Sequence, residues 1–183
     1  SHSPPIPPQA IHLVTIPKEE LGGVLVGSYA ISEQVRHMPL LVERKVTIYS
    51  STCRVAIQVR SKLSNKGDLG DFTIAVSVPE HCDSDTVEVL RGEGSYDDLK
   101  RTIRWNMKEL PRGESFMVSA QAQLWSPLSR QEQKLVRFPV LVRCSSSKDQ
   151  ISSVEFRATE AENHPASVTF YGTKSFRLLH RLP

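Results

Sequence analysis

Apolar and polar residues alternate along most of the chain, in short runs that are separated by polar segments. The alternation is clear around Val55 and Ile57 in the run 53–63, and it returns in the runs 71–79 and 114–125. Successive side chains of a strand point to opposite faces of a sheet, so such a run has one packed face and one solvent face. This arrangement is typical of antiparallel sheets.

The pattern predicts a succession of strands, and turn segments rich in Gly, Pro, Asp and Ser separate them. The predicted strands are 11–16, 23–31, 40–50, 53–63, 71–79, 86–91, 100–109, 114–125, 134–143, 152–159, 167–171 and 175–182. Segments 17–23 and 95–101 each suit a single helical turn, and no run has the periodicity of an amphipathic helix. We therefore expect an all-β protein, an elongated antiparallel β-sandwich of two subdomains.

The phase of the alternation also assigns the core. Trp105 is in phase with Ile103 and opposite to Arg104, which places the indole on the packed face. The residues that we assign to the core in this way are Trp105, Phe116, Val118 and Ile74. Trp125 ends its run beside a proline, so we expect it to be half exposed and available for partner contact.

Composition is that of an ordinary folded protein. Of the 183 residues, 39% are hydrophobic and 23% are charged, and the formal net charge is +3. The proline-rich start is the exception, because its composition does not suit a folded core. We interpret residues 1–10 as a linker or the remnant of a tag. The small net charge and the absence of aligned exposed aromatic residues argue against a nucleic-acid partner.

Cysteine usage favours a reducing compartment. Cys53, Cys82 and Cys144 are far apart, their number is odd, and no C-x-x-C pair or N-x-S/T sequon occurs. These features suit a cytoplasmic protein without a disulfide framework or zinc site. No long apolar run suggests a membrane span or a signal peptide.

The sequence offers no catalytic arrangement. No histidine pairs with a cysteine or carboxylate at metal-ligand spacing, and no G-x-S-x-G motif occurs. Gly92-Glu93-Gly94 is not a phosphate-binding loop, because neither a helix nor a Lys-Ser/Thr pair follows it. We therefore expect no enzyme activity, no cofactor and no metal.

Basic residues form two weak clusters. The first contains Arg54, Arg60, Lys62 and Lys66, and the second contains Lys134, Arg137 and Arg143. Residues two apart on a strand share a face, so Arg60 and Lys62 are candidates for contact with an anionic phospholipid surface or a protein partner. A plain solvated face is the alternative interpretation of both clusters.

Several segments resemble, in their order, the mu homology domain of clathrin-adaptor medium subunits, muniscins and stonins. They are Val76–Pro79 at a strand end, Gly94 with Tyr96, Ile103-Arg104-Trp105-Asn106-Met107, Gly113, Met117–Leu124, and Phe170-Tyr171-Gly172. The resemblance covers nearly the whole chain after residue 6 and corresponds to the last two-thirds of such a domain. It implies a domain over 11–183, with a subdomain of about 45–130 inserted into a remainder made of 11–44 and 131–183.

The resemblance also implies a function. It points to a non-enzymatic protein-interaction module of an endocytic or vesicle-trafficking adaptor, which binds scaffold or cargo proteins. Such a module is cytoplasmic and peripheral to the membrane of coated pits or vesicles. The Trp-x-Arg pair with which cargo-binding medium subunits grip tyrosine-based signals falls here at Ser167 and Thr169, which favours the muniscin and stonin side of the family.

The same resemblance predicts an exposed sheet edge. If the chain holds the later part of such a domain, the strands 167–171 and 175–182 lack the earlier strand with which they would pair. An unpaired strand edge recruits another strand. We therefore expect a homodimer, or pairing with another chain, through these terminal strands.

One alternative stays open at this stage. An extracellular β-sandwich, such as a segment of an adhesion protein or receptor, has the same strand pattern. That alternative predicts an internal disulfide, either Cys82–Cys144 or Cys53–Cys82.

Overall fold

The computed structural model describes residues 25, 28, 37–151 and 172–183. All of its strands and helices belong to one unit, Val35–Pro183. Of the strands predicted from the sequence, 11–16, 152–159 and 167–171 lie outside the described residues. In 23–31 only Leu25 and Ser28 are described, and neither belongs to a strand.

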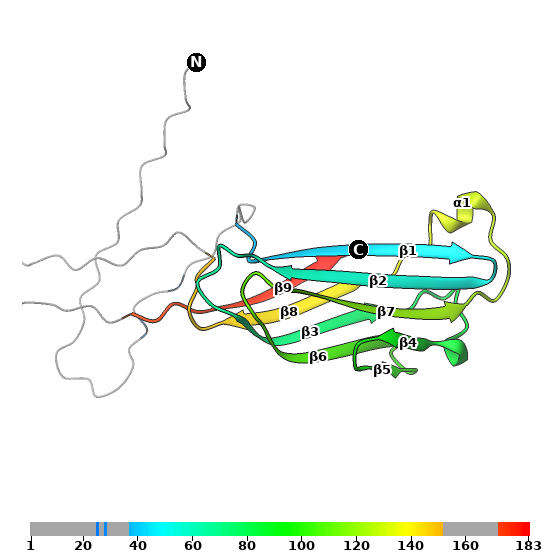
Figure 1. Cartoon of the computed structure of the whole chain (residues 1–183). Coiled ribbons are helices and arrows are strands. Elements are labelled where there is room, and N and C mark those ends of the chain that lie inside the picture. The colour runs from blue at the N-terminus through cyan, green and yellow to red at the C-terminus, as the bar shows by residue number, and fades with distance from the viewer. Residues whose placement is uncertain (1–24, 26–27, 29–36, 152–171) are drawn as a thin grey trace, which may run out of the picture. The chain divides into compact units, whose positions relative to one another are not determined.

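The described strands form two antiparallel sheets (Figure 1). The first has the order β1-β2-β7-β4 and consists of β1 (Leu40–Tyr49), β2 (Thr52–Ser61), β7 (Ser115–Gln123) and β4 (Glu88–Arg91). The second has the order β5-β6-β3-β8-β9 and consists of β5 (Gly94–Asp97), β6 (Thr102–Leu110), β3 (Leu69–Ser77), β8 (Val140–Ser146) and β9 (Phe176–Leu182). Two short helices, η1 (Ser84–Thr86) and α1 (Arg130–Gln133), lie in the connections. The predicted all-β antiparallel sandwich is confirmed.

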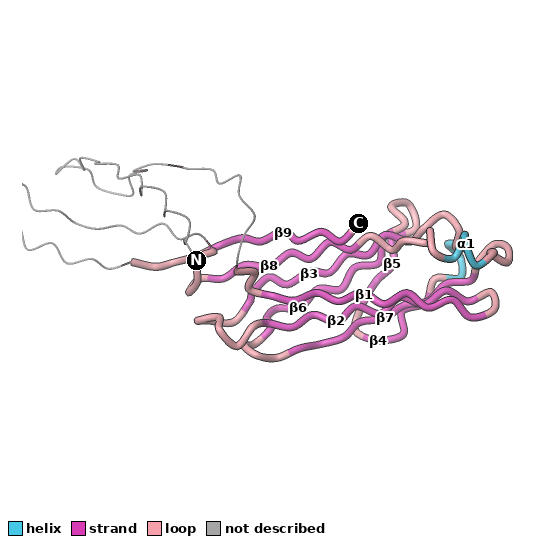
Figure 2. Tube along the Cα trace, turned by 90° about the horizontal axis from the view of Figure 1, so that it is seen from above, coloured by secondary structure: helices cyan, strands magenta, loops and turns pink. Residues whose placement is uncertain are grey.

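Apolar side chains from both sheets meet between them and form the core. The inward positions of β2, among them Val55 and Ile57, have no exposed surface. They face a second layer from β3 and β8 that includes Phe72, Ile74 and Val142. Figure 2 shows the strands of both sheets running along a common direction, as in aligned sandwiches. The predicted division into an inserted subdomain of 45–130 and a remainder stays a prediction.

Two local predictions were wrong. The segment 95–101, for which a helical turn was expected, begins as strand β5, and Tyr96 pairs with Ile103 of β6. The strand predicted over 134–143 begins only at Val140. Helix α1 precedes it, because Ser129 and Glu132 form a capping box that nucleates a turn there.

Trp105 is the main core residue of the hairpin that β5 and β6 form. The side chain is 2% exposed, and its neighbours across the sheet are Ile74 of β3 and Gly94 of β5. Its indole Nε1–H donates to the carbonyl oxygen of Arg91 at 3.2 Å. A Cβ atom at Gly94 would lie 2.5 Å from that same nitrogen, so the indole ring covers the glycine. The turn between β4 and β5 therefore needs small residues because the tryptophan fills the space above it.

The other predicted core positions are mostly buried. Ile74 and Val118 are fully enclosed, at 0% and 1% exposure. Phe116 is half-buried at the margin of the core, where its ring meets Phe72 edge to face with centroids 5.8 Å apart. The alternation thus gave the correct face for all of these residues.

The terminal strand β9 pairs with β8 along its whole length. Among the described strands, β9 is one edge strand of the second sheet, and β1 is one edge strand of the first. The predicted partner for this edge, a second copy or another chain, stays a prediction because the strand 167–171 lies outside the described residues.

We expect Gly94→Ala to destabilise the chain by about 1–3 kcal/mol, since the added methyl group overlaps the Trp105 indole in a packed core. Chemical denaturation followed by circular dichroism measures the difference. Gly172→Ala is the matched control, because a Cβ atom there meets no atom of the described residues within 4 Å. Equal stability of the Gly94→Ala variant and the wild type would show that the indole does not cover this turn.

Candidate functional site

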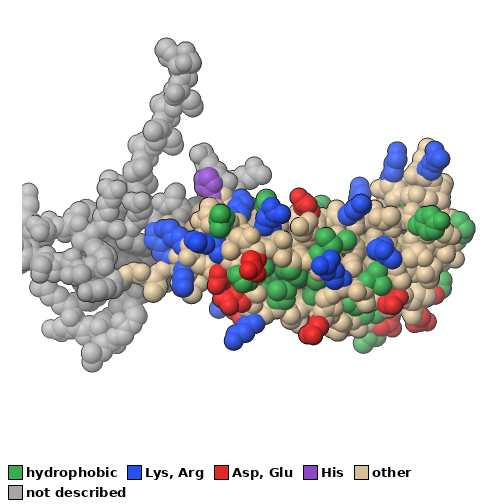
Figure 3. Space-filling view, viewed as in Figure 1, with side chains coloured by type: hydrophobic (Ala, Val, Ile, Leu, Met, Phe, Trp, Pro, Cys, Tyr) green, Lys and Arg blue, Asp and Glu red, His purple; other side chains and the backbone are tan. Residues whose placement is uncertain are grey.

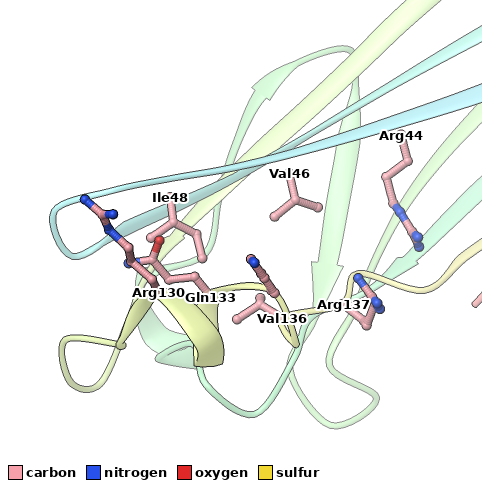
Figure 4. Close-up of a pocket in the computed structure, with 8 residues that line it drawn as sticks. Arg44, Val46, Ile48, Arg130, Gln133, Val136 and Arg137 are labelled. Carbon is pink, nitrogen blue, oxygen red and sulfur yellow. The ribbon is translucent and has the colours of Figure 1, made fainter.

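A groove lies between β1 and the segment 130–137, which leads from β7 in the first sheet to β8 in the second (Figure 4). It is open to solvent and has a volume of about 590 Å³. The residues that line it are Arg44, Val46, Ile48, Arg130, Gln133, Lys134, Val136 and Arg137. We call it the β1 groove.

The groove exists because β1 is incompletely covered. The inward side chains of β2 are fully buried, whereas Val46 and Ile48 on the inward face of β1 are only half-buried. The segment after β7 crosses below this face and packs Val136 and Phe138 into the core, at 3% and 1% exposure. This segment closes the sandwich and leaves a trough between itself and the strand.

The capping of α1 fixes one wall of the groove. The Ser129 hydroxyl accepts from the backbone N–H of Glu132 at 3.2 Å, and the Glu132 carboxylate accepts from the backbone N–H of Ser129 at 2.7 Å. The hydrogen bonds from the backbone and the side chain of Ser129 lower the pKa of the Glu132 carboxyl. Residues 130, 133 and 134 have the spacing of one helix face, which places Arg130, Gln133 and Lys134 together on this wall.

Arg44 ties the two sheets together at the other end of the groove. Its Nη1 donates to the carbonyl oxygen of Phe138 at 2.8 Å and to that of Pro183 at 2.7 Å. These bonds link β1 to the residues just before β8 and just after β9. Burial and, second, the positive charge of Arg137 lower the pKa of the Arg44 guanidinium, which nevertheless stays protonated because its ordinary pKa is so high.

The charge of the groove is uniformly positive. Its lining includes Arg44, Arg130, Lys134 and Arg137 and no carboxylate. In the described part of the chain, the side-chain ion pair that forms is Lys100 with Asp97, on another turn. Lys and Arg side chains gather over β1 and near α1 on the face seen in Figure 3. The β1 groove is thus a cationic trough with an aliphatic floor.

The residues predicted for lipid or partner contact lie elsewhere. Arg54 and Arg60 are on the outer face of β2, six residues and about 20 Å apart along the strand, so they do not form one cluster. Lys62 and Lys66 follow the end of β2, where the backbone N–H of Lys66 donates to the Asp149 carboxylate at 2.8 Å. Their contact with lipid or partners stays a prediction.

Trp125 was predicted to be half exposed, and its side chain is 65% exposed. It follows β7 directly, and its backbone N–H donates to the carbonyl oxygen of His81 at 3.1 Å. It does not line the β1 groove. Its part in partner contact stays a prediction.

Part of the groove lining belongs to a basic cluster that the sequence suggested, and the rest does not. Lys134 and Arg137, from the second weak basic cluster, line it, whereas Arg143 of that cluster lies on β8 outside it. Arg44 and Arg130 were not considered. A signal for Arg44 was present, because it occupies an inward position of β1 among apolar residues.

The three cysteines are buried free thiols. A hydrogen bond with Cys82 and burial raise the pKa of Cys53, and burial raises the pKa of Cys144 to about 12. Neither disulfide that the extracellular alternative predicts is formed. The hydrogen bond with Cys53 and the charge of Arg101 lower the pKa of Cys82, although burial opposes this shift.

The described residues contain neither a metal-binding cluster nor a membrane-spanning helix. No three His, Cys, Asp or Glu side chains lie together in a way that could hold a metal ion. No helix in this part of the chain is long and apolar enough to cross a membrane.

We expect Arg44→Met to lower the free energy of unfolding by about 1.5–3 kcal/mol, because two carbonyl oxygens lose a charged donor. Denaturant titration measures the loss. Arg54→Met is the matched control, since that exposed arginine makes one side-chain bond, to Gln121, and should change stability by less than about 0.5 kcal/mol. A loss as small as that of the control would show that the cross-sheet tie does not stabilise the sandwich.

We expect stability to fall at alkaline pH, partly through Cys144. The unfolded thiol loses its proton near pH 9, whereas the folded thiol keeps it until about pH 12. The native state therefore binds more protons in this window, and each pH unit removes roughly 1.4 kcal/mol for this group. Denaturation curves of the wild type and Cys144→Ala between pH 8 and pH 10 test this. Parallel pH slopes for the two proteins would contradict it.

A curated relative gives a first comparison with known proteins. The chain is 28% identical over 132 residues to AP-1 complex subunit mu-2 from Bos taurus. The match covers 71% of this chain and 30% of the relative. The chain thus spans about a third of the length of this relative.

Solved structures give more distant likenesses. The Fcho1 mu homology domain from Danio rerio, solved with a bound Eps15 peptide, matches 76% of this chain and 43% of its own, at 12% identity and a TM-score of 0.49. A GH20 exo-β-N-acetylglucosaminidase from Vibrio harveyi matches 58% of this chain and 16% of its own, at 11% identity and a TM-score of 0.40. At these values neither likeness bears on what the chain does.

The comparison with family models covers most of the chain. The model of the adaptor complexes medium subunit family matches residues 6–175, which includes the segments that suggested the mu homology resemblance. The two antiparallel sheets agree with that resemblance, which is confirmed. This chain therefore belongs to the adaptor complexes medium subunit family.

Proposed function

We propose that the chain is a non-enzymatic protein-interaction module of an endocytic or vesicle-trafficking adaptor. In this role it binds segments of scaffold or cargo proteins on the cytoplasmic side of a membrane. The observation that carries the proposal is the family match over residues 6–175.

Two further observations support a binding role. The relative from Bos taurus is named as a subunit of an adaptor complex. Buried free thiols suit a reducing compartment, which is where such adaptors meet their partners.

The chemistry of the described residues favours binding over catalysis. Strongly shifted pKa values mark many active sites, and here the raised values belong to thiols inside the core, away from the β1 groove. The groove itself holds cations and aliphatic groups and offers no nucleophile beside a general base. Cations beside an aliphatic surface are suited to recognising a segment of another protein.

The test is a peptide-display library that contains the disordered cytoplasmic segments of a eukaryotic proteome. Panned against the folded chain, it should enrich segments of trafficking scaffold or cargo proteins, and these should bind with dissociation constants of about 1–100 μM, a range usual for short segments. Heat-unfolded chain is the control for non-specific capture. Enrichment no greater than on the unfolded chain would contradict the proposal.

A further inference from the structure

We propose that the β1 groove is the docking site for an extended acidic segment of a partner protein. Carboxylates of the segment pair with the cations at the two ends of the groove, and an apolar side chain between them rests on Val46 and Ile48. This inference rests on the proposed function and adds to it a place on the molecule and the chemistry of the segment.

The positive charges of the groove have no carboxylate side chain beside them among the lining residues. Arg44 and Arg137 are close enough for the charge of Arg137 to lower the pKa of Arg44, and no Asp or Glu side chain lines the groove beside them. Arg44 is half-buried and Arg137 is exposed, so water screens their repulsion only in part. An anion bound between the two guanidinium groups would attract both of them. The site is therefore complementary to a carboxylate.

Two hydrogen bonds hold the Arg44 guanidinium in place before any partner binds. Both of its hydrogen bonds, to the carbonyl oxygens of Phe138 and Pro183, use Nη1. Within the described part of the chain, its Nε and Nη2 donors stay available, and together they offer the two-pronged geometry that fits a carboxylate. A guanidinium held in place binds at a smaller entropic cost than one that must first be ordered.

The spacing of the inward side chains of β1 suits an extended peptide. Arg44, Val46 and Ile48 occupy successive positions of one strand face, about 6.6 Å apart. Figure 4 shows these side chains pointing toward the segment 130–137, with Arg137 at the Arg44 end and Arg130 at the Ile48 end. An extended peptide has the same repeat, so an acidic residue, an apolar residue two positions on and a second acidic residue beyond it match the groove.

The shape favours a protein segment over a lipid surface. Val46 and Ile48 are half-buried between β1 and the capped helix, whereas rim cations such as Arg130 are exposed, so a segment that inserts one side chain can contact the apolar floor and the cations together. An extended segment with side chains at alternating positions can lay an apolar side chain in this open trough. A lipid surface is kept as an outcome of the test.

The test uses a phage library of random twelve-residue peptides, panned against the full chain. We expect the selected peptides to contain Asp or Glu on both sides of Leu, Ile, Val or Phe. Affinities of labelled selected peptides are then measured by fluorescence polarisation for wild type, for Lys134→Glu with Arg137→Glu, and for Ile48→Asn. The matched control is Arg104→Glu with Lys108→Glu, which changes the net charge equally on exposed positions of β6. Thermal unfolding verifies that each variant is folded.

The groove variant should bind at least about tenfold more weakly than the wild type, and the control within about twofold, because only the first reverses charges that face the segment. Ile48→Asn should weaken binding without changing its salt dependence, since it removes apolar contact and no charge.

Selected peptides that are not acidic, or that bind the groove variant as tightly as the wild type, overturn the inference and leave the proposed function standing. Failure of the folded wild type to select any peptide contradicts the proposed function itself. Loss of binding of the groove variant to phosphatidylserine vesicles, with peptide binding unchanged, would assign the groove to lipid and overturn the inference.

Discussion

The packing of Val136 and Phe138 beneath β1 is the contact on which the rest of this structure depends. A strand at the end of a sheet has a neighbour on one side only, and its inward face is the hardest part of a sandwich to cover. The segment between β7 and β8 solves this by crossing from one sheet to the other under β1, and Arg44 fastens the crossing with bonds to Phe138 and Pro183. The crossing segment covers the edge of the core, but it leaves Val46 and Ile48 half-exposed, and this uncovered strip is the floor of the β1 groove.

The same closure accounts for the chemistry of the site. A crossing segment that packs only two side chains inward must direct the others outward, and here those others include Arg130, Lys134 and Arg137. The Glu132 carboxylate accepts from the backbone N–H of Ser129 in the capping box, and it does not line the groove. Positive charge therefore collects beside half-covered aliphatic side chains, a combination suited to an acidic and partly apolar partner.

The sequence was sufficient for the architecture wherever one strand has one buried face. The alternation around Val55 and Ile57 gave β2, and the phase of Trp105 gave the packed face of β6, because burial imposes a period of two. The sequence did not predict β5, because its residues Ser95 and Asp97 are typical of turns. They form a strand only because β5 pairs with β6 and the Trp105 indole packs on Gly94. The sequence failed at the groove because Arg44 and Arg137 are far apart in the chain and meet only through the crossing of the sheets. Predicting that meeting needs the order of the strands, which no local pattern contains.

The most direct test of the account is a nuclear magnetic resonance titration of the isotope-labelled chain with an acidic partner segment, following each backbone amide. If the segment docks beside β1, the largest shift changes fall on residues 44–48 and 130–137 and leave the outer face of β2 unaffected. Shift changes centred on Arg60 and Lys62, or on Trp125, without shift changes at the residues of the β1 groove, would contradict the account.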